Sequence, residues 1–346
     1  MIEKIKAGFK AIGVSRLIIS VFLISLFVIG SFAGISPVLS ASDVIVRVGM
    51  NGILVLSMIP MIQSGCGLNF GIPVGLVAGI LGGVFALEIG STGFTGIIIA
   101  VSIAAVFGAL FGWLYSLVLN RVKGDEMIIA TYIGYSFVYA MNMFWMTYPF
   151  RNPASVQGFK GEGLRPTISV EKYWIQFFDS LLAIKIGKFT FPTGLILLFA
   201  FMCLLMWLFF KTKTGTAITA VGSNPEYARA SGISIDRMRS ISVVISTALA
   251  AIGTVVYQQS FGFIQTFTAP LAFTFPSVAA VLLGGASINK ASITNVVVGT
   301  ILFQGLLTMT PSVINSIIEI DASEVFRIII TNGLILYALT RKLRQN

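Results

Sequence analysis

The sequence contains no histidine and only two cysteines, Cys66 and Cys203. Without histidine, the chain lacks the side chain that most often moves protons near neutral pH and most often binds metals. The cysteines lie far apart in apolar stretches, so their spacing indicates neither a metal site nor a disulfide framework. Charged residues are also scarce: they make up 10% of the 346 residues, against about a quarter in soluble domains. Because so few charges cannot cover a water-facing surface, a soluble enzyme, a secreted disulfide-rich domain and a disordered chain are all excluded.

Motifs of catalysis and nucleotide binding are absent from the sequence as well. It has no glycine-rich loop ending in Lys-Ser or Lys-Thr, so the chain does not bind ATP through a phosphate-binding loop. It also shows no nucleophile–base pair and no cluster of metal ligands. We therefore predict a protein that is not an enzyme, with no catalytic residue, metal site or cofactor in this chain.

What the sequence has in abundance is apolar residues, which form 56% of the chain and give a mean hydropathy of +0.94. A helix needs about 20 mostly apolar residues to cross a bilayer, and a charge at its centre costs about 2.5–3.5 kcal/mol. The runs with few charges predict ten such helices, and hence an all-α polytopic membrane protein. The spans are one in 17–42, two in 48–87, one in 89–120, one in 127–150, one in 189–210, two in 240–289, one in 291–318 and one in 325–340.

The distribution of basic residues predicts the orientation of the chain. If the N-terminus is cytoplasmic, the inner segments are 1–16, 120–126, 211–239, Lys290 and 341–346, with 15 Lys and Arg against five Asp and Glu. The other segments have equal numbers of basic and acidic residues, so the whole net charge of +10 lies on one side. This is the distribution expected of a membrane protein, because cytoplasmic loops carry an excess of Lys and Arg. We expect both termini in the cytoplasm, a multi-pass protein of the cell membrane, and no nucleic-acid partner. The first span resembles a signal peptide, but its apolar run exceeds the typical length of about 7–15 residues, which favours a retained helix.

Acidic residues are predicted at the ends of the spans and not at their centres. These residues are Asp43, Glu88, Asp125, Glu126, Glu319, Asp321 and Glu324. Ion-coupled transporters often use ionisable groups at depth to bind the driving ion. The pattern therefore disfavours an ion-coupled secondary transporter, which stays as an alternative from another class together with an intramembrane enzyme or scaffold.

Two glycine-rich breaks interrupt the apolar runs, at 64–73 and 283–289. Non-helical backbone at membrane depth is tolerated only when it is buried in protein or lines a cavity. We expect broken helices that line a central pathway, although close packing of small residues is the alternative for each position. The predicted pathway residues are Ser64, Gly65, Gly67, Asn69, Phe70, Gly284, Gly285, Ser287 and Asn289.

The long inner segment 211–239 contains the signature of a short capped helix. Asn224 suits the N-cap, Pro225 the first helical position, Glu226 the positive N-terminal end and Gly232 the C-terminal stop. So short a helix is unstable alone, so it must be held by packing. A polar helix of this kind between two spans is suited to docking another protein.

The same segment resembles a known signature. Residues 212–215, 220–224 and 228–233 match the pattern T-x-x-G…A-x-G-x-N-x-x-x-A-R-x-x-G-I. This pattern is typical of permease subunits of ABC importers of the ribose/galactose and branched-chain amino acid class, a family that also includes nucleoside permeases. The run Ala279–Ser287 and the break 65–71 resemble the family's glycine-rich segments, so the resemblance extends over most of the chain.

The resemblance implies a machine of several subunits. A separate ATPase would bind ATP and magnesium and would receive the 224–232 helix in a groove, which makes Gly222, Asn224, Pro225, Glu226, Arg229 and Gly232 the coupling residues. It further implies an extracytoplasmic solute-binding protein and a second permease, identical or a sister chain. We expect a single permease domain over 1–346 that translocates a sugar or sugar-like solute, with a nucleoside as the alternative. The segment 151–188 is expected to form a small external lid.

Overall fold

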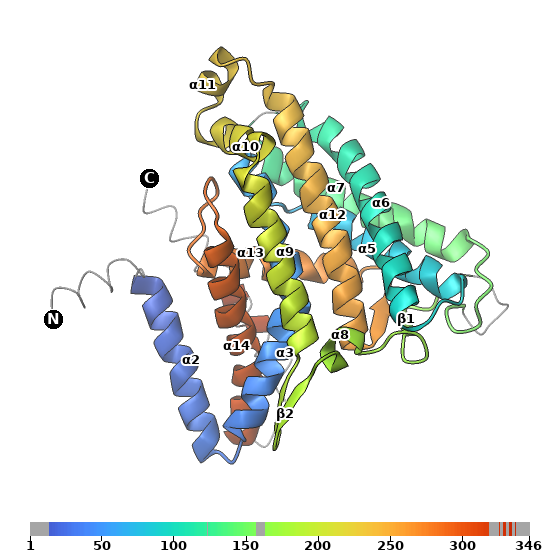
Figure 1. Ribbon diagram of the computed structural model, residues 1–346, viewed down its shortest axis with the longest axis vertical. Coiled ribbons are helices and arrows are strands. Elements are labelled where there is room, and N and C mark those ends of the chain that lie inside the picture. Colours follow the sequence, from blue (N-terminus) through green and yellow to red (C-terminus); the bar gives the residue numbers. More distant parts are fainter. Residues whose placement is uncertain are drawn as a thin grey trace.

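The computed structural model describes residues 14–122, 124–156 and 163–317, together with single residues between 325 and 336. Most of this part of the chain is helical, and the long helices run side by side between two ends of the molecule (Figure 1). The helices are α2 (Val14–Phe32), α3 (Pro37–Leu56), α4 (Met58–Gln63), α5 (Ile72–Glu88), α6 (Gly93–Leu119), α7 (Glu126–Thr147), α8 (Phe177–Ser180), α9 (Thr193–Lys211), α10 (Lys213–Ser223), α11 (Pro225–Ala230), α12 (Ile235–Phe261), the 3₁₀-helix η1 (Ala269–Phe273), α13 (Thr274–Leu283) and α14 (Ile293–Ile317).

Six helices in the described part of the chain are long and apolar enough to cross a membrane. They are Pro37–Gln63, Gly93–Leu119, Glu126–Thr147, Thr193–Lys211, Ile235–Phe261 and Ile293–Ser316. Three shorter apolar helices, Arg16–Phe32, Ile72–Glu88 and Ala269–Leu283, coincide with three further predicted spans. The multi-pass helical architecture is confirmed. The count of ten stays a prediction, because the last span, 325–340, lies largely outside the described residues.

The boundary between the first two helices differs from the prediction. The run 17–42 was expected to be one span, but α2 ends at Phe32 and α3 already begins at Pro37. Gly34 adopts φ +83°, which favours glycine, and Pro37 occupies the first turn of the next helix. As a consequence, Asp43 lies within α3 and not in the loop between two spans.

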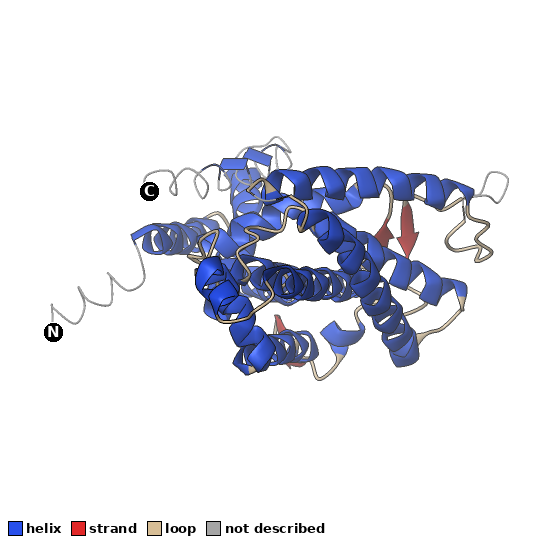
Figure 2. Ribbon diagram, turned by 90° about the horizontal axis from the view of Figure 1, so that it is seen from above, coloured by secondary structure: helices blue, strands red, loops and turns tan. Residues whose placement is uncertain are grey.

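Four short strands depart from the all-α prediction. β1 (Thr167–Ser169) pairs antiparallel with β4 (Phe263–Gln265), and β2 (Ile184–Ile186) pairs antiparallel with β3 (Phe189–Phe191). Figure 2, seen from the end of the molecule that carries α11, shows them as small pieces beside the helices. Each strand has three residues, too few to give a hydropathy signal in a chain dominated by long apolar runs.

Helix α12 is at the centre of the packing, with its most extensive contacts to α6 and α5. Small residues allow this close approach: a Cβ added at Gly75 of α5 would lie 2.6 Å from the Thr247 carbonyl oxygen of α12. Gly108 of α6 approaches the same carbonyl oxygen so closely that a Cβ there would lie at 3.2 Å. Membrane helices associate through such small-residue surfaces because lipid provides no hydrophobic drive.

The loops lie at two opposite ends of the molecule (Figure 1). Successive loops alternate between these ends, as expected when each predicted span crosses from one end to the other. At the end with α10 and α11, Asn120 bonds to residues of the N-terminal part of α12, and Gly65 lies against Gly222. At the end with α8 and β2, the Ser42 hydroxyl donates to the Thr190 carbonyl oxygen at 2.6 Å. We call these the α11 end and the α8 end.

Candidate functional site

A cavity of about 1160 Å³ lies at the α8 end of the molecule. Its walls come from α3, α8, α12, η1, α13 and α14 and from the β2–β3 hairpin, segments far apart in the sequence. The lining includes two acidic residues, Asp43 and Asp179, and two basic residues, Arg47 and Lys185. Because the charges of the described lining residues balance, this part of the cavity suits a solute without a large net charge.

The Asp179 carboxylate joins α8 to the last turn of α12. Gln259 Nε2 and Ser260 Oγ donate to its Oδ2 atom at 2.8 and 2.7 Å. The Phe178 amide in turn donates to Gln259 Oε1 at 3.1 Å. These bonds attach α8, in the segment expected to form an external lid, to the last turns of the central helix.

An aromatic corner stands on one wall of the cavity. The rings of Tyr257 and Phe261 are stacked with centroids 5.3 Å apart, and Phe273 meets Tyr257 edge-on at 4.8 Å. Amide side chains, including those of Gln265 and Gln304, also line the cavity. Flat apolar faces next to hydrogen-bonding groups are typical of sites that bind small polar ring compounds.

None of the nine predicted pathway residues lies on the described walls of this cavity. The sequence contained a signal for it that we did not use, the polar and aromatic run 257–261 at the end of an apolar span. Such a run at the end of a transmembrane helix must face protein or water, because lipid offers its polar groups no partners.

The first break is largely buried and extends from the α11 end towards the middle of α12. Asn69 is fully buried, and its Nδ2 atom donates to Ser246 Oγ at 2.8 Å, while Tyr115 OH donates to Asn69 Oδ1 at 3.3 Å. The Ser64 hydroxyl donates to the Met61 carbonyl oxygen at 2.9 Å. These polar groups are thus satisfied within the protein in this conformation.

The second break lies beside the first. Gly67 of the first break approaches Ile288, and Gln63 Nε2 donates to the carbonyl oxygen of Ala291. Within the second break, Asn295 Nδ2 donates to the Gly284 carbonyl oxygen at 2.7 Å, and Gly285 adopts φ +89°. The structure therefore brings the two predicted breaks together and closes the molecule at the α11 end. The remaining predicted residues lie around this junction. Gly65 follows the end of α4, and the ring of Phe70 lies 5.9 Å from that of Phe275. Ser287 and Asn289 are exposed.

The capped helix predicted in the 211–239 segment is confirmed as α11. The Asn224 side chain accepts a hydrogen bond from the Tyr227 amide at 3.0 Å, and Pro225 takes the first helical position. Gly232 follows the helix with φ +78°. The Ile233 amide donates to the Ala228 carbonyl oxygen at 3.0 Å, which completes the C-terminal cap.

Helix α11 presents a polar surface at the edge of the molecule. Its Ala228 is fully buried, whereas Tyr227 is 68% exposed. Arg229 and Glu226 form an ion pair of 3.4 Å with side chains that are 62% and 81% exposed. An exposed pair of this kind contributes at most about 1 kcal/mol, so it adds little to the stability of the fold.

The segment before α11 touches the first break directly. A Cβ added at Gly222 would lie 2.1 Å from the Gln63 carbonyl oxygen and 2.9 Å from the Gly65 nitrogen. This position accepts only glycine because both neighbours are backbone atoms. One of the predicted coupling residues thus packs against one of the predicted pathway residues.

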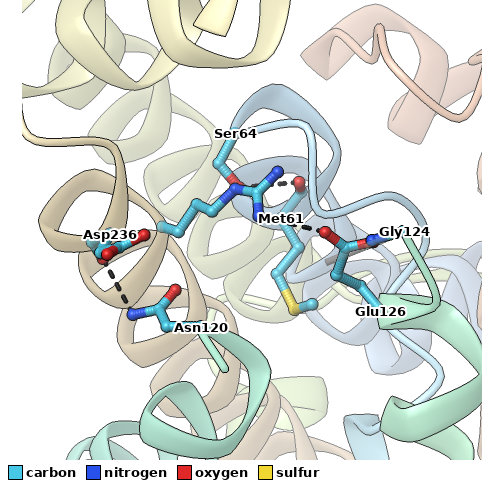
Figure 3. A network of polar contacts seen from close by, with 7 residues as sticks. Met61, Ser64, Asn120, Gly124, Glu126 and Asp236 are labelled. Carbon is cyan, nitrogen blue, oxygen red and sulfur yellow. Dashed lines mark hydrogen bonds and ion pairs between the residues drawn. The ribbon is translucent and has the colours of Figure 1, made fainter. Parts of the chain in front are cut away.

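A polar network ties three helices together beside α11 (Figure 3). Arg239 Nη1 of α12 lies 3.1 Å from Glu126 Oε1 of α7, and both side chains are largely buried, with 14% and 13% exposed. Asn120, directly after α6, donates through Nδ2 to the Asp236 carbonyl oxygen at 3.1 Å. A hollow of about 540 Å³ separates this network from Glu226 and from the other residues of α11.

Comparison with known proteins agrees with the geometry in indicating a membrane transport protein. The family model described as branched-chain amino acid transport system, permease component, matches residues 40–339. The nucleoside ABC transporter permease protein NupB of Lactococcus lactis subsp. cremoris is 40% identical over 101 residues, which are 28% of this chain and 27% of NupB. The autoinducer 2 import system permease protein LsrC of Escherichia coli is 31% identical over 119 residues, 34% of this chain and 33% of LsrC. The matched stretch thus spans a third or less of these relatives, and no solved structure matches significantly.

Proposed function

Because this chain belongs to the permease family of the branched-chain amino acid transport systems, we propose that it is the membrane-spanning subunit of an ATP-driven ABC importer. It is a multi-pass protein of the cell membrane. The observation that carries the proposal is the contrast between its two ends. A cavity of about 1160 Å³ lies at the α8 end, whereas towards the α11 end the first break packs against Gly222 and against Ile288 of the second break.

This contrast supports a path that opens to one side at a time. In the proposed cycle, the solute enters the cavity from outside, beside the external segment. The junction of the two breaks then separates and releases it to the cytoplasm. The nine predicted pathway residues at these breaks would line the path in the second state, when the bonds of Asn69 to Ser246 have opened.

The energy for this change would come from a separate ATPase that binds α11. Two features support coupling through Gly222, Asn224, Pro225, Glu226, Arg229 and Gly232. The helix is capped and polar, and the backbone directly before it packs on the first break, so a displacement of α11 acts on the closed end. An extracytoplasmic binding protein would deliver the solute near 151–188, and a second permease, identical or a sister chain, would complete the assembly.

We propose a sugar-like solute, with nucleosides included in that class. The balanced charges, the amides and the aromatic corner support a neutral ring compound with several hydroxyl groups. The similarity to the permease NupB is an argument for a nucleoside, and the cavity accommodates either compound.

The test is copurification of the chain with the ATPase and binding protein encoded beside it, followed by a solute screen. Hydrolysis of ATP by the complex should rise when the binding protein carries its solute. A matched complex with an inactivated ATPase provides the background rate. If the chain never associates with an ATPase, or if no solute of any class raises hydrolysis, the proposal is wrong.

A further inference from the structure

One buried amide in the last turn of α12 is not accounted for by the path described above. Gln258 of α12 is 2% exposed, and neither its Nε2 nor its Oε1 atom has a hydrogen-bond partner among the described residues. A buried polar group left unpaired is unfavourable, so an unpaired amide at this depth suggests a partner that is not part of the chain. Its neighbour Gln259 differs, because its amide bonds to Asp179 and to the Phe178 backbone.

The Gln258 side chain lines a small void next to the large cavity. The void holds about 20 Å³, and its walls include the apolar side chains of Leu76 and Ile80. Three of its lining residues, Tyr257, Gln265 and Phe273, also line the large cavity. The aromatic corner is therefore a partition between the solute cavity and the unpaired amide.

The backbone of α5 leaves room for this amide. A Cβ added at Gly83 would lie 2.6 Å from Gln258 Oε1, so any side chain at that position would displace the amide. The second amide at this boundary, Gln265, follows in β4 and lines both spaces. Two amides thus lie at the partition, one buried beside the void and one lining both spaces.

The chemistry of this corner fits a flat heterocycle. A carboxamide offers a donor and an acceptor side by side, the pairing through which Gln and Asn read the edge of a nucleobase. The aromatic corner offers rings for a planar base to stack on, with Phe261 exposed at the cavity wall. A saturated sugar ring has neither a flat face of this kind nor a planar donor–acceptor edge.

We propose that Gln258, together with Gln265 and the aromatic corner, forms a subsite that takes the heterocyclic base of a nucleoside. The inference rests on the proposed function, which it narrows from sugar-like solutes to nucleosides. The base stacks in the large cavity on the exposed side of the aromatic corner, at Phe261, and rotation of the Phe273 side chain joins the void to the cavity. Gln258 then pairs with the polar edge of the base, and the ribose hydroxyls face the cavity lined by Asp43 and Arg47.

The experiment measures uptake of labelled uridine into proteoliposomes that hold the complete importer with its ATPase and binding protein. Gln258→Leu removes both amide atoms at nearly constant volume and places an apolar group beside Leu76 and Ile80, so the variant should fold. We expect KM for uridine to rise at least tenfold, with a change in kcat of less than threefold. In the unaltered importer, unlabelled adenosine should compete with uridine, and ribose at the same concentration should not.

The matched control is Thr300→Val, which also replaces a fully buried polar atom without a partner among the described residues, on α14 and outside both cavities. It should leave KM within twofold. Since the same binding protein serves every variant, a difference in KM reports on the permease. An unchanged KM in Gln258→Leu overturns the subsite, as does equal competition by ribose, or ATP-driven uptake of ribose without uptake of uridine. The absence of ATP-driven uptake of every solute tested would instead overturn the proposed function.

Discussion

Replacement of Gly222 by alanine is the sharpest test of how motion at α11 reaches the closed end of the path. The new Cβ would lie 2.1 Å from the Gln63 carbonyl oxygen, whereas real Cβ atoms essentially never approach below 3.0 Å. Both atoms belong to backbone, so no side chain can rotate away, and the two segments must separate by about 0.9 Å. Overpacking of this kind costs about 1–3 kcal/mol, part of which the higher helix propensity of alanine offsets.

We expect Gly222→Ala to weaken the contact between α10 and the first break without unfolding the long helices. ATP hydrolysis by the reconstituted importer should continue, while the number of solute molecules imported per ATP hydrolysed falls at least tenfold. Ser223→Ala is the control, because this neighbouring side chain is exposed. A Gly222→Ala importer with the unaltered ratio of transport to hydrolysis would refute the reasoning.

Three further predictions concern the closed end and its partner. Glu126→Arg and Arg239→Glu should each reduce uptake, because each places two like charges in a largely buried contact and drives the two side chains apart. The double swap restores opposite charges and should restore at least part of the uptake. A double variant no better than either single variant would contradict a role for the pair. Asn69→Leu should lower the melting temperature because the buried Tyr115 hydroxyl loses its acceptor, Asn69 Oδ1, at about 1–3 kcal/mol; normal stability with impaired uptake would instead favour contact with the solute. Glu226→Gln should change the free energy of unfolding by less than about 1 kcal/mol yet reduce copurification of the ATPase, and undiminished copurification would argue against a contact there.

Features set by short-range chemistry could be predicted from the sequence. The cap of α11 is the clearest case, since Asn224, Pro225 and Gly232 act within a few residues of one another. The alternation of loops between two ends also follows from the apolar runs, because each span reverses the direction of the chain. The two breaks were likewise located by their glycines, and their meeting at one end follows from the same alternation.

The cavity could not be predicted, because its walls combine residues from Asp43 to Gln304 that only the packing brings together. Hydropathy does not say which face of an apolar helix meets protein and which meets lipid. Hydropathy also does not indicate the end of α2. There, Gly34 and Pro37 end one helix and begin the next without introducing a charge. Attention to those two residues would have placed Asp43 and Arg47 in α3.

The central claim is that this chain transports solute only with the free energy of ATP hydrolysis by a partner subunit. The direct measurement is accumulation of labelled uridine or ribose in proteoliposomes above the outside concentration. We predict accumulation when the chain, its ATPase, its binding protein and ATP are all present, and none when the chain alone is given a proton or sodium gradient. Accumulation by the chain alone under such a gradient would contradict the account.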